Sequence, residues 1–215
     1  MSGQKITPQQ MFKAAQSPVS WLLSAEHLEQ GAEAIIERED QFYVPYLQAY
    51  DAAVKQAMVQ AVSEGNKSGQ AEILARVPNY APAYVLYAYA IENVLKGLIV
   101  ANEPQLINGD KLDKVLKDHD LRALAKRAGF TVHVQEESVL DALSELSVWA
   151  GRYPVALNVT DFAGTPNRDE LMDYGSRNPI MRTFFRRAYQ ALEAKLPSPV
   201  SSRYGLVVVF RPPGA

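Results

Sequence analysis

The chain has 215 residues, of which 47% are hydrophobic and 21% are charged, and its formal net charge at pH 7 is −2. This composition provides enough apolar residues for a sizeable core and excludes wholesale disorder, and the small net charge argues against a protein that binds polyanions over its whole surface. Because the chain contains no cysteine, disulfides, thiolate metal sites and a cysteine nucleophile are excluded as well.

The N-terminal half predicts two helices. The first opens at Ser17-Pro18, with serine as the N-cap and proline in the first turn, and its apolar residues keep helical spacing as far as residue 35. A charged break over residues 37–40 follows. A second helix is expected to start near Pro45 and to end at Gly65, where a looser connection with a short helical turn over 71–77 begins.

The middle of the chain carries its most apolar stretch. Residues 82–102 predict a long helix, and the window 81–101 has about the length of a membrane span. Glu92 and Lys96 lie in the centre of this window, where a charge costs about 2.5–3.5 kcal/mol on insertion scales. We therefore expect a buried helix or a subunit interface and no membrane contact. The N-terminus also lacks the pattern of a secretory signal, so a cytoplasmic protein is predicted.

Shorter elements follow. A small helix is expected over 111–116, and the next helix begins at the sequence Asp118-His119-Asp120 and stops at Gly129. Residues 131–134 alternate like a short strand, and residues 136–151 return to helical spacing.

The sequence pattern changes in the C-terminal part. A loop over 158–167 and a short helix over 169–174 lead to a strongly signalled helix over 178–196. Residues 206–210 are β-like, and a lone strand needs a partner, either the stretch 131–135 or a second subunit.

The last 40 residues are also basic. From Ser176 to Ala215 there are seven Lys or Arg against one acid, a charge of +6, so the preceding residues carry −8. Arg182, Arg186 and Arg187 lie within two turns of the predicted helix. This asymmetry predicts either a basic contact surface for nucleic acid or for an acidic partner, or a tail that docks on its own acidic body.

Six or seven helices with little strand predict an all-α protein. We expect an up-and-down helical bundle with four to five core helices over 18–157. The C-terminal extension 158–215, with the helix 178–196 and the tail 206–210, is expected to pack on that bundle.

Three separated segments resemble motifs of the HEPN superfamily of helical bundles. The stretch from Tyr87 to Leu98 is similar to the family's "aiE-x-x-lKall" helix, and His119-Asp120-Leu121 with Leu124 is similar to its "HDL-x-x-L" helix start. Arg152-Tyr153-Pro154 resembles the "RYP" that ends the last bundle helix. The resemblance covers about residues 81–157 and implies a four- or five-helix bundle that commonly forms dimers.

The resemblance also implies a set of possible functions. Many HEPN domains are metal-independent endoribonucleases, often toxins, that use an arginine followed four to six residues later by a histidine; others bind nucleotides or are non-catalytic modules. Arg152 has no such histidine after it. The pair Arg127 and His133 has a suitable spacing, but it lies after the HDL helix and across Gly129.

We therefore predict a non-catalytic binding or interaction module that binds a nucleotide or RNA phosphate as a homodimer, with no cofactor and no metal. Two alternatives stay open. One is a toxin-like endoribonuclease, with His119, Arg152, Arg127 and His133 as the candidate catalytic residues. The other is a structural partner protein that docks through its basic C-terminal helix and tail.

The candidate ligand-binding residues have structural interpretations as well. Glu92 and Lys96 form an i,i+4 ion pair on a solvated or cleft-facing stripe, or else they face a ligand. Asp118 or His119 caps a helix, with Asp120 in its first turn, or else the helix's free amides and His119 hold a phosphate. Arg152 and Tyr153 end a helix, or else Arg152 meets His119 as an anion-binding or acid–base pair.

Overall fold

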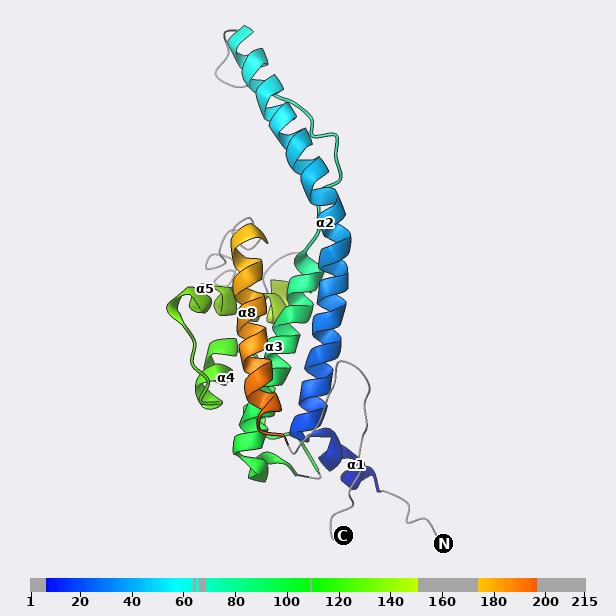
Figure 1. Ribbon diagram of the computed structural model, residues 1–215, viewed down its shortest axis with the longest axis vertical. Coiled ribbons are helices and arrows are strands. Elements are labelled where there is room, and N and C mark those ends of the chain that lie inside the picture. Colours follow the sequence, from blue (N-terminus) through cyan, green and yellow to red (C-terminus); the bar gives the residue numbers. More distant parts are fainter. Residues whose placement is uncertain (1–6, 64, 66–68, 109, 151–173, 197–215) are drawn as a thin grey trace.

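The computed structural model describes residues 7–63, 65, 69–108, 110–150 and 174–196, which form a helical body with a long arm projecting from it (Figure 1). No strand occurs within these ranges. The all-α prediction is therefore confirmed for the part of the chain that the structure describes. The expectations for 151–173 and 197–215, which include Arg152, Tyr153 and the β-like tail, fall outside it.

The N-terminal half forms one short and one very long helix. Helix α1 (Pro8–Ala15) starts with a capping box between Thr7 and Gln10 and was not predicted. Helix α2 (Pro18–Ser63) runs without interruption for 46 residues, so the expected break over 37–40 and the separate start at Pro45 are wrong.

The charged run does not end the helix because tertiary contacts hold it in place. Glu39 is buried, and its carboxylate accepts hydrogen bonds from Arg76 (2.7 Å) and from the backbone amide of Asn79 (3.0 Å). Pro45 removes one backbone hydrogen bond, which a helix supported by packing tolerates. The segment that follows α2 returns along it, and the helical turn expected over 71–77 is absent there.

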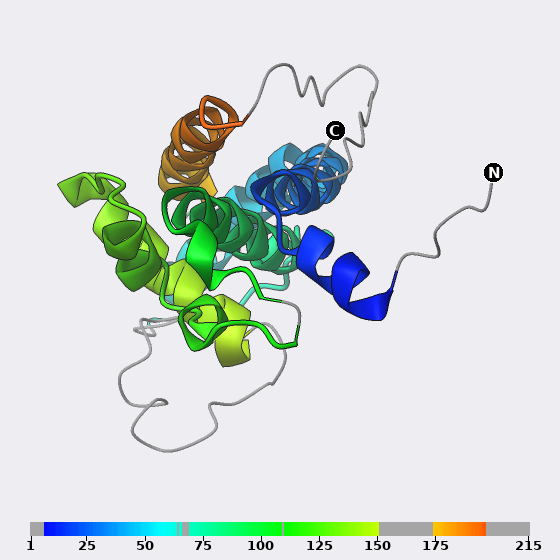
Figure 2. The ribbon, with the colours of Figure 1, turned by 90° about the horizontal axis from the view of Figure 1, so that it is seen from below.

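Helix α3 (Ala81–Asn102) runs antiparallel to α2 and forms the centre of the core. Seen along the bundle, it lies between α2 and α8 (Tyr174–Glu193), with the shorter helices on its other side (Figure 2). It is long and apolar enough to cross a membrane, but 78% of its most apolar window is buried within the protein. Gly97 permits this close packing, because a Cβ there would lie 2.5 Å from Leu192 and 3.1 Å from Trp21.

The elements after α3 are short. Two 3-10 turns follow α3, η1 (Pro104–Leu106) and η2 (Lys114–Lys117). The second lies where a helix was expected over 111–116. Helix α4 (Leu121–Arg127) is followed by Gly129, whose φ of 66° is the left-handed conformation that ends a helix, as predicted.

The strand expected over 131–134 is wrong, because α5 (Val134–Glu145) begins there. The backbone amide of His133 donates to the Glu136 carboxylate (2.8 Å), an N-terminal capping interaction that competes with a strand. A π-helical turn, η3 (Leu146–Ala150), continues α5.

Helix α8 joins the body through its charged residues as well as its apolar face. It begins at Tyr174, before the Asn178-Pro179 start that was predicted. Phe184 and Phe185 are buried, while Arg182 pairs with Glu33 on α2 and Arg187 pairs with Glu136 on α5. These two arginines therefore dock the basic helix on acids of its own body, and the exposed Arg186 lies beside them.

Candidate functional site

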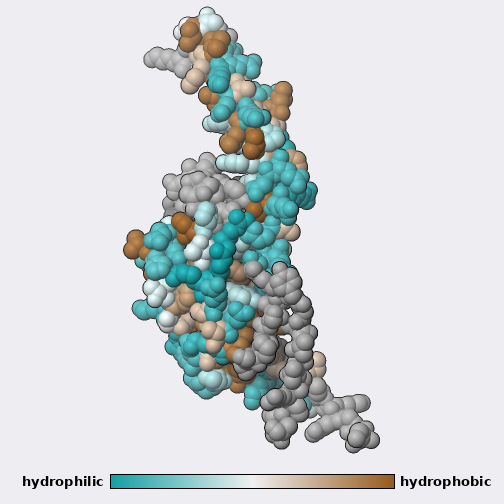
Figure 3. Space-filling view, viewed as in Figure 1, coloured by the Kyte–Doolittle hydropathy of each residue, from teal (hydrophilic) through white to brown (hydrophobic). Residues whose placement is uncertain are grey.

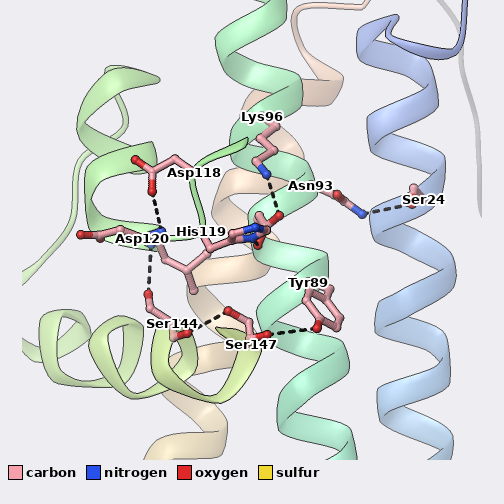
Figure 4. Close-up of polar contacts among 11 residues, drawn as sticks. Ser24, Tyr89, Asn93, Lys96, Asp118, His119, Asp120, Ser144 and Ser147 are labelled. Carbon is pink, nitrogen blue, oxygen red and sulfur yellow. Dashed lines mark hydrogen bonds and ion pairs between the residues drawn. The ribbon is translucent and has the colours of Figure 1, made fainter. Parts of the chain in front are cut away.

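Two distant segments bring Glu92, Lys96 and His119 into contact, and Figure 4 shows Lys96 and His119 on these two segments. On α3, Lys96 Nζ lies 2.6 Å from Glu92 Oε1. From the turn before α4, His119 Nδ1 lies 2.9 Å from Glu92 Oε2. We call these three residues the Glu92 cluster. It joins the first two segments on which the HEPN resemblance rests.

The ion pair at the base of the cluster is buried. The side chains of Glu92 and Lys96 are 8% and 4% exposed, so the expectation that they occupy a solvated or cleft-facing stripe is wrong. A buried ammonium without a counter-charge is strongly unfavourable, and the carboxylate of Glu92 supplies that counter-charge. One oxygen of the Glu92 carboxylate contacts Lys96 and the other contacts His119, so Glu92 connects the buried lysine to the histidine.

His119 links this buried pair to the surface, since its side chain is 48% exposed. An ionised carboxylate only accepts hydrogen bonds, so the contact with Glu92 places a proton on Nδ1. In the neutral ring, Nε2 is then a proton acceptor, and in the charged ring it is a donor. Nε2 makes no hydrogen bond to any other described residue. The fixed ring therefore offers one nitrogen to a ligand.

Side chains of the turn itself and of α5 hold the turn that carries His119 (Figure 4). Asp120, and neither Asp118 nor His119, is the N-cap of α4: its carboxylate accepts from the amide of Ala123 (2.9 Å). The amide of Asp120 donates to Asp118 (3.1 Å), and the amide of Leu121 donates to Ser144 Oγ on α5 (3.0 Å). The prediction that free amides at this helix start hold a phosphate is therefore wrong for these three amides.

Further hydrogen bonds tie the site to the bundle. Ser147 Oγ donates to the carbonyl of Ser144 (2.9 Å), and Tyr89 on α3 donates to the carbonyl of Ser147 (3.1 Å). On the opposite side of α3, Asn93 donates to Ser24 on α2 (3.0 Å). Polar contacts with α2, α5 and η3 thus fix the two segments that carry the cluster.

A basic cleft of about 500 Å³ borders the turn that carries His119. Its lining includes Lys114 and Lys117 from η2, Asp118, and Arg127 from the end of α4. Arg127 is held by Glu103, with Nε 2.8 Å from Oε1. Both lysines are exposed. Glu103 offsets the charge of Arg127, so the two lysines against Asp118 give this cleft a small excess of positive charge, which favours an anion.

The Arg127 and His133 pair is not assembled. Arg127 bonds to Glu103, whereas His133 Nε2 lies 2.9 Å from Arg187 on α8. Arg152 lies outside the described residues, so its meeting with His119 stays a prediction. Within the described ranges, no group of three or more His, Asp or Glu side chains is arranged to hold a metal ion.

A second polar cluster, which was not predicted from the sequence, lies between α2, α3 and α8. Arg182 Nε lies 2.6 Å from Glu33 Oε1, and Tyr87 donates to the same carboxylate. Burial would raise the pKa of Glu33, but the hydrogen bonds from Arg182 and Tyr87 outweigh it and hold this pKa below its ordinary value. Burial and the bond to Glu33 raise the pKa of Tyr87 above its ordinary value.

This cluster lines a half-open cavity of about 450 Å³ together with Phe185, Arg186 and Tyr189. The opposite charges of the body and the C-terminal helix were the signal that could have predicted it. Its members satisfy one another, which makes it a structural contact between helices.

No protein-family model matches the chain, and no curated protein or solved structure similar to it was found.

Proposed function

We propose that the chain is a non-catalytic HEPN-like module of the cytoplasm that binds the phosphate of a nucleotide or RNA at His119 and acts as a homodimer. The observation that carries the proposal is the contact of His119 with Glu92. A half-exposed imidazole is held by a buried carboxylate through Nδ1, and no other described residue hydrogen-bonds its second nitrogen.

The charges around His119 favour an anionic ligand. A protonated imidazole donates a charge-assisted hydrogen bond to a phosphate oxygen, which is about twice as strong as a neutral one. Lys114 and Lys117 line the neighbouring cleft and can contact further phosphates of a strand. Asp118 stands on the same rim and limits how many phosphates can approach closely.

Calorimetric titration with nucleoside triphosphates and with a short single-stranded RNA tests the proposal. We expect His119→Ala to weaken binding about tenfold, the value of one charge-assisted hydrogen bond. His27→Ala, which removes an exposed histidine from α2, is the matched control and should leave affinity unchanged. Absence of heat with every ligand would overturn the binding function.

The two lysines give a second measurement. The logarithm of the RNA affinity falls with the logarithm of the salt concentration, and the slope is about 0.7 for each phosphate that the protein neutralises on a single strand. Lys114→Ala/Lys117→Ala should therefore have a slope that is smaller by about 0.7 per lysine that binds a phosphate. An unchanged slope would remove the cleft from the binding surface and leave His119 alone at the site.

An endoribonuclease is the second candidate, and the contact between Glu92 and His119 favours it. A carboxylate that fixes a histidine through Nδ1 leaves Nε2 able to take a proton from a ribose hydroxyl. Purified protein should then cleave RNA, His119→Ala should abolish cleavage, and His133→Ala should retain it. If the wild-type protein leaves RNA intact under conditions where it binds RNA, the ribonuclease is excluded.

The third alternative, docking on another protein through the basic C-terminal helix, has less support. Arg182 and Arg187 are engaged by Glu33 and Glu136 of the same chain, so both lack the freedom that an acidic partner requires.

A further inference from the structure

The distal half of α2 projects from the body as an arm (Figure 1), which we define as residues 44–63 with the returning segment 69–79. The returning segment covers one face of the helix: the amide of Gln70 donates to Gln60 (3.2 Å), and Gly69 lies against the backbone of Ala57. Arg76 stacks on the ring of Phe42 at the base of the arm. These contacts leave the opposite face of the helix bare.

Large apolar side chains occupy that bare face, where hydrophobic patches are visible along the arm (Figure 3). Val44, Leu47, Met58 and Val62 are all exposed, Met58 by 64% and Val62 by 83%. Together with the half-buried Val54 they recur at spacings of three, four and seven residues, which places them in one strip along the helix. Exposed apolar side chains aligned in this way are typical of a helix face that pairs with another helix.

The charges of the arm indicate which partner the strip accepts. Its described charged residues are Asp51, Lys55, Glu72 and Arg76, so they sum to zero and give no preference for a strongly acidic or basic partner. Asp51 and Lys55 lie at the strip, one turn apart. If two copies of the helix pair antiparallel, each aspartate lies beside the lysine of the other copy. In such a pair, the apolar residues of one strip therefore face those of the identical strip on the other copy, and each charge lies beside an opposite charge.

We propose that the arm pairs antiparallel with the arm of a second copy of this chain. In the register that the spacing favours, Leu47 opposes Met58 of the partner copy, Val44 opposes Ala61, and Asp51 opposes Val54 with Lys55 beside it. The inference rests on the homodimer of the proposed function but not on its ligand.

The absence of cysteine from the chain makes disulfide cross-linking a clean test. In Leu47→Cys/Met58→Cys, the two cysteines of one helix are eleven residues or about 16 Å apart, too far for a disulfide. Mild oxidation should therefore link two chains covalently. Each single variant should stay unlinked, because the antiparallel register opposes position 47 to position 58.

Gln48→Cys/Val59→Cys is the matched control pair, with the same separation but with each position rotated by about 100° from Leu47 and Met58. It should stay unlinked as well. Efficient cross-linking of Leu47→Cys alone would indicate a parallel pair and overturn the proposed arrangement. Equal cross-linking of the control pair would show chance collisions and overturn it too.

Sedimentation separates this inference from the homodimer itself. Wild-type protein should sediment as a dimer and Leu47→Glu/Met58→Glu as a monomer, with unchanged helical content because both positions are exposed. A dimer that survives these substitutions would overturn the role of the arm and leave the homodimer standing. A monomeric wild-type protein would overturn both.

Discussion

Replacing Glu92 by glutamine should destabilise the protein more than its single-atom change suggests. The substitution keeps the size of the side chain but removes its charge. Lys96 is almost fully buried, and the carboxylate of Glu92 is the only hydrogen-bond acceptor found for its ammonium among the described residues. Glu92→Gln therefore leaves a buried positive charge without its counter-charge.

The burial of this ion pair determines how much unfolding free energy should be lost. Breaking a buried ion pair by removing one partner costs about 3–5 kcal/mol of unfolding free energy. The contact with His119 adds about 1 kcal/mol at most, because half of that side chain is in solvent. At about 2–4 °C per kcal/mol for a chain of this size, the midpoint of thermal unfolding should fall by roughly 6–20 °C.

Urea unfolding followed by far-ultraviolet circular dichroism measures the effect in four variants. Glu92→Gln and Lys96→Met should each lose several kcal/mol, whereas Glu92→Gln/Lys96→Met should recover much of the loss, because no buried charge is then left without its counter-charge. His119→Ala should stay within about 1 kcal/mol of the wild type. The reasoning is refuted if Glu92→Gln is within about 1 kcal/mol of the wild type, or if the double variant loses the sum of the two single losses.

Two further predictions concern the packing of the helices. Gly97→Ala should lower the unfolding free energy by about 1–3 kcal/mol, because its Cβ would overlap Leu192. Gly31→Ala should raise it by about 0.5–1 kcal/mol, because its Cβ would meet Leu86 at an ordinary 3.4 Å and alanine favours a helix. Equal effects of the two substitutions in chemical denaturation would contradict the packing of α3. The lowered pKa of Glu33 means that its contribution to stability is present at neutral pH and is lost as the pH falls below the ordinary value of 4.5 and through the folded-state pKa. The stability difference between the wild type and Glu33→Gln, measured by urea unfolding from pH 7 to pH 3, should therefore shrink toward acid, and a constant difference would contradict this.

Local sequence signals predicted the helices that are determined by residues within them or directly at their ends. Gly129 ends α4 through its left-handed backbone, and the long apolar run predicted the helix α3, which is largely buried within the protein. The i,i+4 order of Glu92 and Lys96 predicted their pairing correctly. In each case the cause lies within a few residues of the effect.

The failures share the opposite property, because their causes lie far away in the sequence. The charged run at 37–40 looked like a break, but Glu39 is held by Arg76, 37 residues later. The amide of Leu121 looked free, but it is taken by Ser144 from the next helix. The burial of Lys96 follows from the packing of α4 against α3, which its own neighbours in the sequence do not reveal.

The proposed pairing of the arms bears on the choice between binding and catalysis. Ser24, level with the Glu92 cluster through its bond to Asn93, lies about 28 residues from the centre of the antiparallel register, or about 43 Å along α2. Two bodies joined by their arms would therefore hold their His119 sites roughly 80 Å apart. In the HEPN superfamily, whose motifs three segments of this chain resemble, the ribonuclease members place their catalytic residues near the dimer interface. A dimer with two remote sites cannot share residues in this way, so each site must act alone.

The dimer should therefore bind two ligands with equal affinity, and Leu47→Glu/Met58→Glu should bind one ligand per monomer equally well. Calorimetry that shows cooperative binding in the dimer, or no binding in the monomer, would contradict either the antiparallel arm or the placement of the ligand at His119.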